Sequence, residues 1–160
     1  MEQEALAHKF ASHAEFEAHL KGVIAQSVAT LQMFDPDFAA FPLGTSEVDA
    51  LLRHFLARGG VLRLAAHRVG YIEMHYPRFL TLLKDYSHRI ECRVTSRALH
   101  HLTDSFCIGD TGHIVRRFHS DHMRGEACFD QPKAIEISQE RFTGIWAESA
   151  PGLHAATTGL

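Results

Sequence analysis

The sequence predicts an α/β domain built on a mixed sheet, and two observations carry this prediction. Between Ser12 and Thr95, segments with helical periodicity alternate with short apolar runs that are typical of buried strands. After Thr95, the pattern changes to a hairpin, one further strand and a final helix. Strands that alternate with helices favour a parallel sheet with right-handed crossovers, whereas the strands of a hairpin are antiparallel. We therefore expect parallel strands first and a hairpin towards the C-terminus, with helices flanking the sheet.

Three helical regions and three strands are expected in the first part of the chain. Ser12 followed by Glu15 is a capping box, which predicts that a helix begins there. Thr45 or Ser46 caps the second helix, whose apolar residues recur at helical spacing. The third helical region is interrupted at Pro77, which is well placed as the first residue of a helix. The three strands are expected at residues 28–34, 61–66 and 89–95.

The second part of the chain is expected to contain a hairpin, a strand and a helix. The hairpin turns at the sequence DTG, residues 110–112, between two arms rich in apolar and β-branched residues. A short apolar stretch after the hairpin predicts another strand, and a Trp-containing stretch near the C-terminus predicts a helix. The expected bounds are 104–109 and 113–117 for the hairpin arms, 124–129 for the strand and about 133–148 for the helix.

Length and composition indicate one globular domain. A chain of 160 residues with 46% hydrophobic and 22% charged residues is long enough for one core and is typical of a globular protein. We assign the domain to residues 12–150 and regard residues 1–11 and 151–160 as terminal extensions. The apolar runs are too short to span a bilayer, and the N-terminal sequence does not resemble a secretory signal. A cytoplasmic protein is therefore expected, with no membrane partner.

The cysteines and the charges exclude several classes of protein. Cys92, Cys107 and Cys128 lie in separate apolar stretches without CxxC spacing, so we expect reduced core thiols instead of disulfides or zinc ligands. The net charge of −3 conceals a basic middle segment, residues 61–124, which holds nine of the arginines. We expect these arginines to pair with acidic residues of the flanking segments. The basic excess is too small to indicate a nucleic-acid-binding protein.

This order of elements, with the stretches "FDPDF", "HYPRFLTLL", "DSFCIGDTGHIVRR" and "RFTGIWAES", resembles the phospholipase D-like superfamily. More narrowly, the stretches resemble a degenerate proteobacterial branch whose members occur alone or next to acetyltransferase domains. The resemblance covers roughly residues 12–150. It implies a phospholipase D-like mixed sheet, with parallel strands and a C-terminal hairpin, flanked by helices. It also implies a homodimer, since single-domain bacterial endonucleases of the superfamily work as homodimers.

The resemblance implies that the catalytic motif of the superfamily, H-x-K-x4-D, lies on the first arm of the hairpin. With Asp110 as the motif aspartate, Thr103 takes the histidine position and Ser105 takes the lysine position. Threonine has no group that titrates near neutral pH, and serine brings no positive charge to a phosphate. Glu126 matches the acidic residue of the later strand in the superfamily. We therefore expect a non-catalytic domain that acts as a binding or interaction module and needs no cofactor.

Two alternatives remain open at this point. The first is an atypical phosphodiesterase or nuclease in which His100, His101 or His122 is the nucleophile. His122 even begins a near-match to the motif, although its aspartate comes one residue too late. The second alternative is a metal-binding protein, because imidazoles and a carboxylate suit zinc. Its candidate ligands are His113, His119, Asp121 and His122.

The topology also suggests a ligand crevice. Ligands of open α/β sheets favour the crevice beyond the carboxyl ends of the parallel strands. We expect polar side chains near those ends to line it and to bind a small anionic ligand, unless they only neutralise one another. The residues assigned to the crevice are Asp35, His67, Arg97, Asp110 and Glu126. The partners expected from the sequence are a second copy of the chain, another protein or this small ligand.

Overall fold

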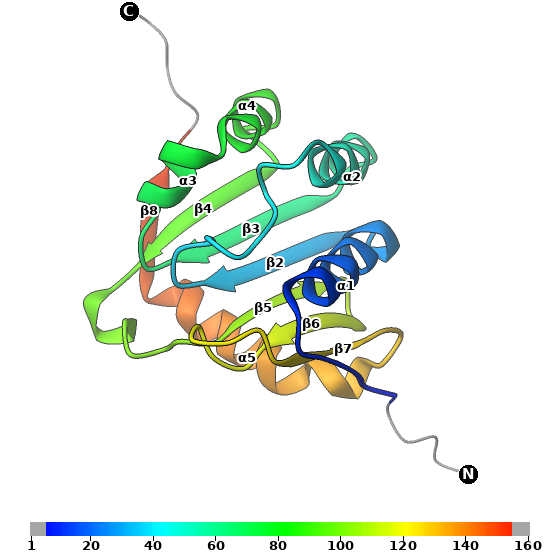
Figure 1. Cartoon of the computed structure of the whole chain (residues 1–160). Helices are drawn as coiled ribbons and strands as arrows, with labels where there is room; N and C mark the ends of the chain where they lie inside the picture. The colour runs from blue at the N-terminus through cyan, green and yellow to red at the C-terminus, as the bar shows by residue number, and fades with distance from the viewer. Residues whose placement is uncertain (1–5, 155–160) are drawn as a thin grey trace, which may run out of the picture.

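The computed structural model describes residues 6–154, and it confirms the α/β prediction with one mixed sheet of eight strands. The strand order is β1-β7-β6-β5-β2-β3-β4-β8 (Figure 1). Three central strands are parallel, as the alternation of helices and strands predicts. They are β2 (Thr30–Asp35), β3 (Val61–Ala66) and β4 (Ile90–Thr95).

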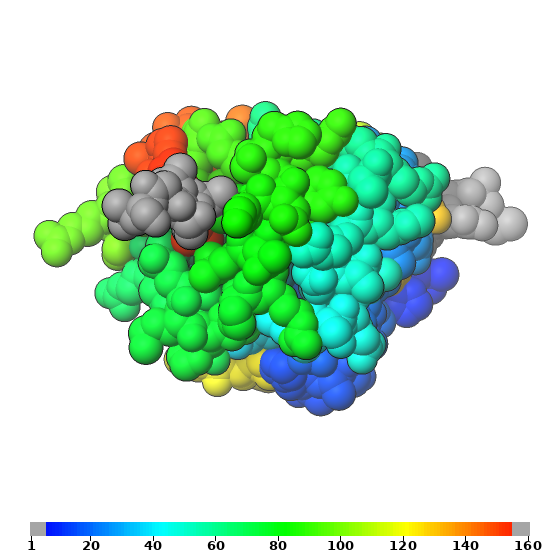
Figure 2. All heavy atoms as spheres, turned by 90° about the horizontal axis from the view of Figure 1, so that it is seen from above, coloured from blue at the N-terminus to red at the C-terminus, as the bar shows by residue number. Residues whose placement is uncertain are grey.

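Helices cover both faces of this sheet (Figure 1). One face carries α1 (His13–Gln26), α2 (Ser46–Ala57), α3 (Gly70–His75) and α4 (Pro77–Asp85). In the view from above, the cyan and green segments lie against one another and make up the centre of the visible surface (Figure 2). The other face carries a single helix, α5 (Pro132–Ala147). Two apolar clusters result, a large one under α1–α4 and a smaller one under α5 that contains Phe106, Phe142 and Trp146.

The hairpin pairs with the parallel strands through its first arm, and this pairing determines which residues lie close together at the site. Its arms are β5 (Ser105–Gly109) and β6 (His113–Arg117), and β7 (Gly125–Cys128) follows as the next antiparallel strand. Because β5 pairs antiparallel with β2, the start of β5 lies beside the end of β2, with Phe106 opposite Phe34. The end of β5 therefore lies beside the start of β2, with Gly109 opposite Leu31.

The regions expected as terminal extensions, residues 1–11 and 151–160, both contribute residues to strands of the sheet. Residues of β1 (His8–Phe10) pair with β7 at one edge of the sheet. Residues of β8 (Ser149–Leu153) pair with β4 at the other edge, with a shift of register near Cys92. The remainder of the predicted C-terminal extension, residues 155–160, lies outside the described residues.

The three cysteines are buried and free, as the sequence predicts. Burial raises the pKa of the Cys92 thiol to about 12, so this group stays protonated at neutral pH. Within residues 6–154, no helix is long and apolar enough to cross a membrane.

Candidate functional site

Buried polar side chains gather where the carboxyl ends of the parallel strands meet the start of β5. Asp35 and Ser105 are completely buried, and Arg117 is only 6% exposed. His67 and Thr95 are also buried at the neighbouring strand ends, but on the α5 face of the sheet, where the His67 ring packs against Phe34. We call Asp35, Ser105 and Arg117 the edge cluster. Asp35, Ser105 and Arg117 lie on the face covered by α1–α4, because their alternate neighbours Met33, Cys107 and Val115 belong to the large apolar cluster.

Asp35 is the centre of the edge cluster. One carboxylate oxygen accepts hydrogen bonds from the backbone amides of Asp37 and Phe38, in a turn that holds Phe38 at a φ of 63°. The other oxygen accepts a hydrogen bond from the hydroxyl of Ser105 and lies 3.5 Å from Nη2 of Arg117. Burial raises the pKa of the Asp35 carboxyl, and these hydrogen bonds and the Arg117 charge oppose that shift. The carboxylate is thus fully engaged by the protein itself.

His67 has a structural role at the same end of the sheet, on the α5 face. Its Nε2 lies 2.8 Å from the carbonyl oxygen of Leu102, and its Nδ1 lies 2.6 Å from the hydroxyl of Thr95. Since a carbonyl only accepts, Nε2 carries a proton. Burial lowers the pKa of His67, which favours the neutral ring, and Nδ1 then accepts from Thr95. His67 therefore holds the connection between β4 and β5 in place.

Arg117 is the least satisfied member of the edge cluster. Its Nη1 reaches only the sulfur of Met123, at 3.5 Å, and its buried Nε has no hydrogen-bond partner in the described structure. The guanidinium thus lies close to Asp35 without a short hydrogen bond to it. Its charge is nevertheless buried with that of Asp35, which makes the two groups dependent on one another.

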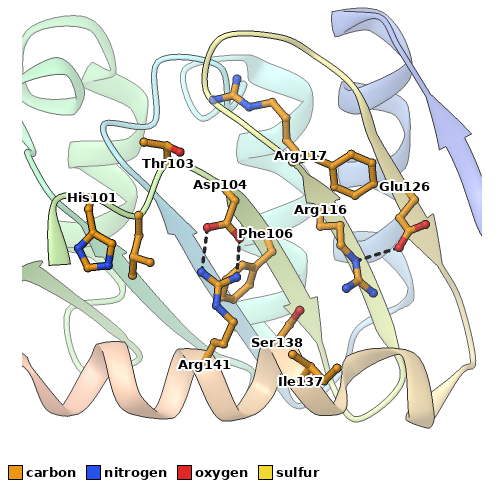
Figure 3. A pocket seen from close by; sticks show the side chains of 12 residues that line it. His101, Thr103, Asp104, Phe106, Arg116, Arg117, Glu126, Ile137, Ser138 and Arg141 are labelled. Carbon is orange, nitrogen blue, oxygen red and sulfur yellow. Dashed lines mark hydrogen bonds and ion pairs between the residues drawn. The ribbon is translucent and has the colours of Figure 1, made fainter.

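A pocket of about 450 Å³ opens at the same end of the sheet, between the hairpin and α5. Two ion pairs lie in it. Asp104 accepts two hydrogen bonds from Arg141, one of them 2.8 Å long, and Arg116 lies 3.3 Å from Glu126. In Figure 3, Ser138 rises from α5 between these pairs, and Arg117 points away from α5. The lining residues are His101, Leu102, Thr103, Asp104, Phe106, Arg116, Arg117, Phe118, Glu126, Ile137, Ser138 and Arg141.

The structure separates the residues that the sequence assigned to one crevice. Asp35 lies in the edge cluster, His67 is buried on the α5 face at the same end of the sheet, and Glu126 lines the pocket. Arg97 is exposed on a short 3₁₀ helix, η1 (Arg97–Leu99), and makes no side-chain hydrogen bond or ion pair with the residues described. Asp110 lies at the opposite end of the sheet. The predicted crevice is therefore corrected, because β5 runs antiparallel to β2 and carries Asp110 away from Asp35.

Asp110 caps the start of β2. Its carboxylate accepts hydrogen bonds from the backbone amides of Val28, Ala29 and Thr30, at 2.7–3.2 Å. Its backbone has a φ of 50°, in the left-handed region that aspartate tolerates better than most residues. Partial burial opposes the charge, but the hydrogen bonds from these amides prevail and lower the pKa of the Asp110 carboxyl.

We predict that Asp110→Asn lowers the free energy of unfolding by about 1.5–3 kcal/mol at pH 7, because charge-assisted hydrogen bonds to the amides are lost. A lowered pKa gives stability that is present above the unfolded value, about 3.9, and lost as the pH falls through the folded value. The difference in urea unfolding between the two proteins should therefore begin to shrink only as the pH falls below about 4. Asp130→Asn is the matched control, because Asp130 has a similar φ of 52° and is exposed. An equal loss in both variants would contradict the capping role.

The candidate histidines lie in different places. The ring of His100 packs 4.8 Å from that of His67, between ring centroids. His101 lines the pocket, and its Nδ1 bonds the carbonyl oxygen of Ala98 at 2.9 Å. His122 is not among the pocket residues, and its Nδ1 accepts from the amide of Arg124. Of these three histidines, only His101 lines the pocket that Thr103 also lines.

The proposed metal ligands are not brought together. His113 begins β6, whereas His119, Asp121 and His122 follow its other end. The described residues contain no group of three or more His, Cys, Asp or Glu side chains arranged to hold a metal ion. The separation follows from strand geometry, because five residues of β-strand span about 17 Å.

Five pocket residues were not predicted as site residues from the sequence, namely Asp104, Arg116, Arg117, Ser138 and Arg141. The paired arginines at the end of the hairpin offered one signal, since alternation places them on opposite faces of the sheet. Arg116 does pair with Glu126 and Arg117 with Asp35, so these two arginines follow the expected pairing with acids of the flanking segments.

Comparison with known proteins places the chain in a family. A family model described as "Domain of unknown function (DUF7931)" matches residues 12–154. The chain belongs to the DUF7931 family. None of the curated proteins compared with this DUF7931 chain matches it.

Solved structures share the fold of this DUF7931 domain. Nuc from Salmonella typhimurium, a phospholipase D family member, has a TM-score of 0.67 at 14% identity, over 93% of this chain and 99% of its own. NucT from Helicobacter pylori has a TM-score of 0.62 at 8% identity, over 93% of this chain and 100% of its own. The archaeal chromatin protein TrmBL2 has a TM-score of 0.68 at 11% identity, over 94% of this chain. This domain spans only 55% of the TrmBL2 chain. The likeness confirms the predicted phospholipase D-like fold.

Proposed function

We propose that this domain is a non-catalytic phospholipase D-like module that binds a ligand or partner instead of hydrolysing phosphodiesters. The observation that carries the proposal is that the edge cluster has no room for the motif lysine. Ser105, in the position of the motif lysine, is completely buried and bonded to Asp35. A lysine would need the volume and the carboxylate oxygen that Ser105 and Arg117 already occupy.

The chemistry of phosphodiester hydrolysis supports this interpretation. A nucleophile must reach the phosphorus, and a cation must stabilise the charge that develops on the phosphate oxygens. Thr103 brings no near-neutral base to the first of these tasks. The nearest buried cation, Arg117, already shares its charge with Asp35. Self-association, another protein or a small anionic ligand remain the partners that we propose for the module.

The competing hypothesis is a phosphodiesterase that uses His101, because this histidine lines the pocket. Its Nδ1 donates to a carbonyl oxygen, which leaves Nε2 without a protein partner in the described structure. Figure 3 places His101 at one margin of the pocket, far from Arg116 and Glu126. No carboxylate among the described residues orients the ring, whereas activated histidines are usually held by a third group.

The proposal is tested by incubating the pure protein with bis-p-nitrophenyl phosphate, with single-stranded DNA and with RNA. We expect no release of p-nitrophenol and no strand cleavage above the rates in buffer. The same preparation is titrated with DNA in a gel-shift assay, in which no complex is expected at physiological salt. Turnover that Thr103→Ala leaves intact and His101→Ala abolishes would establish the competing hypothesis.

A further inference from the structure

The pocket between the hairpin and α5 lies on the opposite face of the sheet from the edge cluster. Phe106 belongs to the apolar cluster under α5, and Arg116 bonds the carbonyl oxygen of Ala134 on that helix. We propose that this pocket binds a small amphiphilic anion, namely a carboxylate or phosphate monoester that carries an alkyl group. The inference rests on the proposed binding function and names the site and the chemistry of its ligand.

Ser138 is the first group that points to a ligand. It lines the pocket, although the residue is only 3% exposed. Its hydroxyl has no hydrogen-bond partner among the described residues, whereas a helical serine commonly bonds the carbonyl oxygen four residues earlier. That oxygen, on Ala134, accepts from Nη2 of Arg116 instead, at 2.9 Å. The Ser138 hydroxyl is therefore free to donate to a molecule in the pocket.

The two arginines of the pocket are held in place by the protein. Asp104 fixes the guanidinium of Arg141, and Glu126 with the Ala134 carbonyl fixes that of Arg116. Each guanidinium has five N–H groups, so both retain donors beyond these contacts. Nε of Arg116 is the atom that lies 3.3 Å from Glu126, and it is buried, so the donors of Arg116 that remain for a ligand are on its terminal nitrogens.

The polar groups that remain for a ligand are therefore mostly donors. Both carboxylates of the pocket already form ion pairs with arginines, which leaves their negative charge neutralised. The Ser138 hydroxyl and the remaining guanidinium N–H groups favour a ligand rich in acceptors. Planar guanidinium groups suit carboxylate and phosphate oxygens in particular.

The apolar residues of the pocket complete the chemistry of the ligand. Phe106 is part of the lining, and Ile137 and Phe118, which also line the pocket, are 73% and 51% exposed. Large apolar side chains at such exposure gain free energy when a ligand covers them. The volume of about 450 Å³ suits a small organic molecule. An anion with an apolar chain would engage the donors and these side chains together.

The test is isothermal titration calorimetry with hexyl phosphate and hexanoate, both below micellar concentrations. Inorganic phosphate, acetate and hexanol serve as probes that lack the chain or the charge. We expect one molecule of hexyl phosphate or hexanoate to bind at least tenfold more tightly than any of these three probes, and the tighter of the two identifies the head group. If inorganic phosphate or hexanol binds as tightly, or if neither amphiphile binds, the inference is overturned.

Ile137→Glu locates the site, because the change puts a negative charge at an exposed position that costs little stability. We expect it to weaken binding of the tighter amphiphile at least tenfold and Ser138→Ala to weaken it twofold to tenfold. Thr143→Glu is the matched control, since Thr143 is exposed on the same helix and does not line the pocket. Equal affinities in Ile137→Glu and Thr143→Glu would overturn the assignment. Failure of this inference is distinct from failure of the proposed function, which shows as phosphodiester turnover.

Discussion

Replacing Asp35 with alanine is expected to lower the free energy of unfolding by about 3–5 kcal/mol, the range for breaking a buried charge pair. The substitution leaves the Arg117 guanidinium buried without its anion. It also removes the acceptor for the Ser105 hydroxyl and for two backbone amides. Urea unfolding measures the loss.

Two companion variants give this prediction its control. Asp37→Ala changes an exposed aspartate in the same turn, which accepts one hydrogen bond from the amide of Ala39, and should cost about 1 kcal/mol or less. Combining Asp35→Ala with Arg117→Met removes both charges, and we expect the double variant to be more stable than Asp35→Ala alone. A loss for Asp35→Ala no larger than that for Asp37→Ala would show that the edge cluster does not stabilise the fold.

Restoring the motif lysine with Ser105→Lys is expected to destabilise the domain by more than about 3 kcal/mol. Ser105 is completely buried, so the longer side chain has no space to occupy. Its ammonium would compete with Arg117 for the same oxygen of Asp35, and two buried cations would then share one anion. The midpoint of thermal unfolding should fall accordingly.

Thr103→His is the matched control for this substitution. Thr103 is half-buried at the pocket and makes no side-chain hydrogen bond with the residues described, so histidine should be tolerated within about 1 kcal/mol. Removing the competing cation should help the lysine, so Ser105→Lys with Arg117→Ser is expected to recover part of the lost stability. Wild-type stability of Ser105→Lys alone would mean that a lysine fits at this position. It would contradict the proposal that the edge cluster has no room for the motif lysine.

The sequence predicted the regular elements well where a periodic pattern was strong. The apolar stripe of α2 and the Pro77 start of α4 are local signals, and both helices begin where those signals lie. The edge strands were missed for local reasons too. A strand of three residues, β1, has too few positions to show alternation, and Pro151 and Gly152 in β8 argue against a strand.

The site was harder to predict because its contacts are remote in sequence. Ser105 and Asp35 are 70 residues apart, and Arg141 and Asp104 are 37 apart. The sequence predicted a hairpin, but it did not show that β5 lies antiparallel beside β2. That one feature of strand order moves Asp110 to the far end of the sheet and brings Ser105 to Asp35. Residue types alone do not determine it.

The most direct test of a non-catalytic domain is the hydrolysis of bis-p-nitrophenyl phosphate by the wild-type protein from pH 5 to pH 9. Single substitutions His100→Ala, His101→Ala and His122→Ala are measured beside it. We predict that all four proteins release p-nitrophenol no faster than buffer at every pH. Wild-type turnover above buffer that any one of these substitutions abolishes would contradict the proposed loss of catalysis.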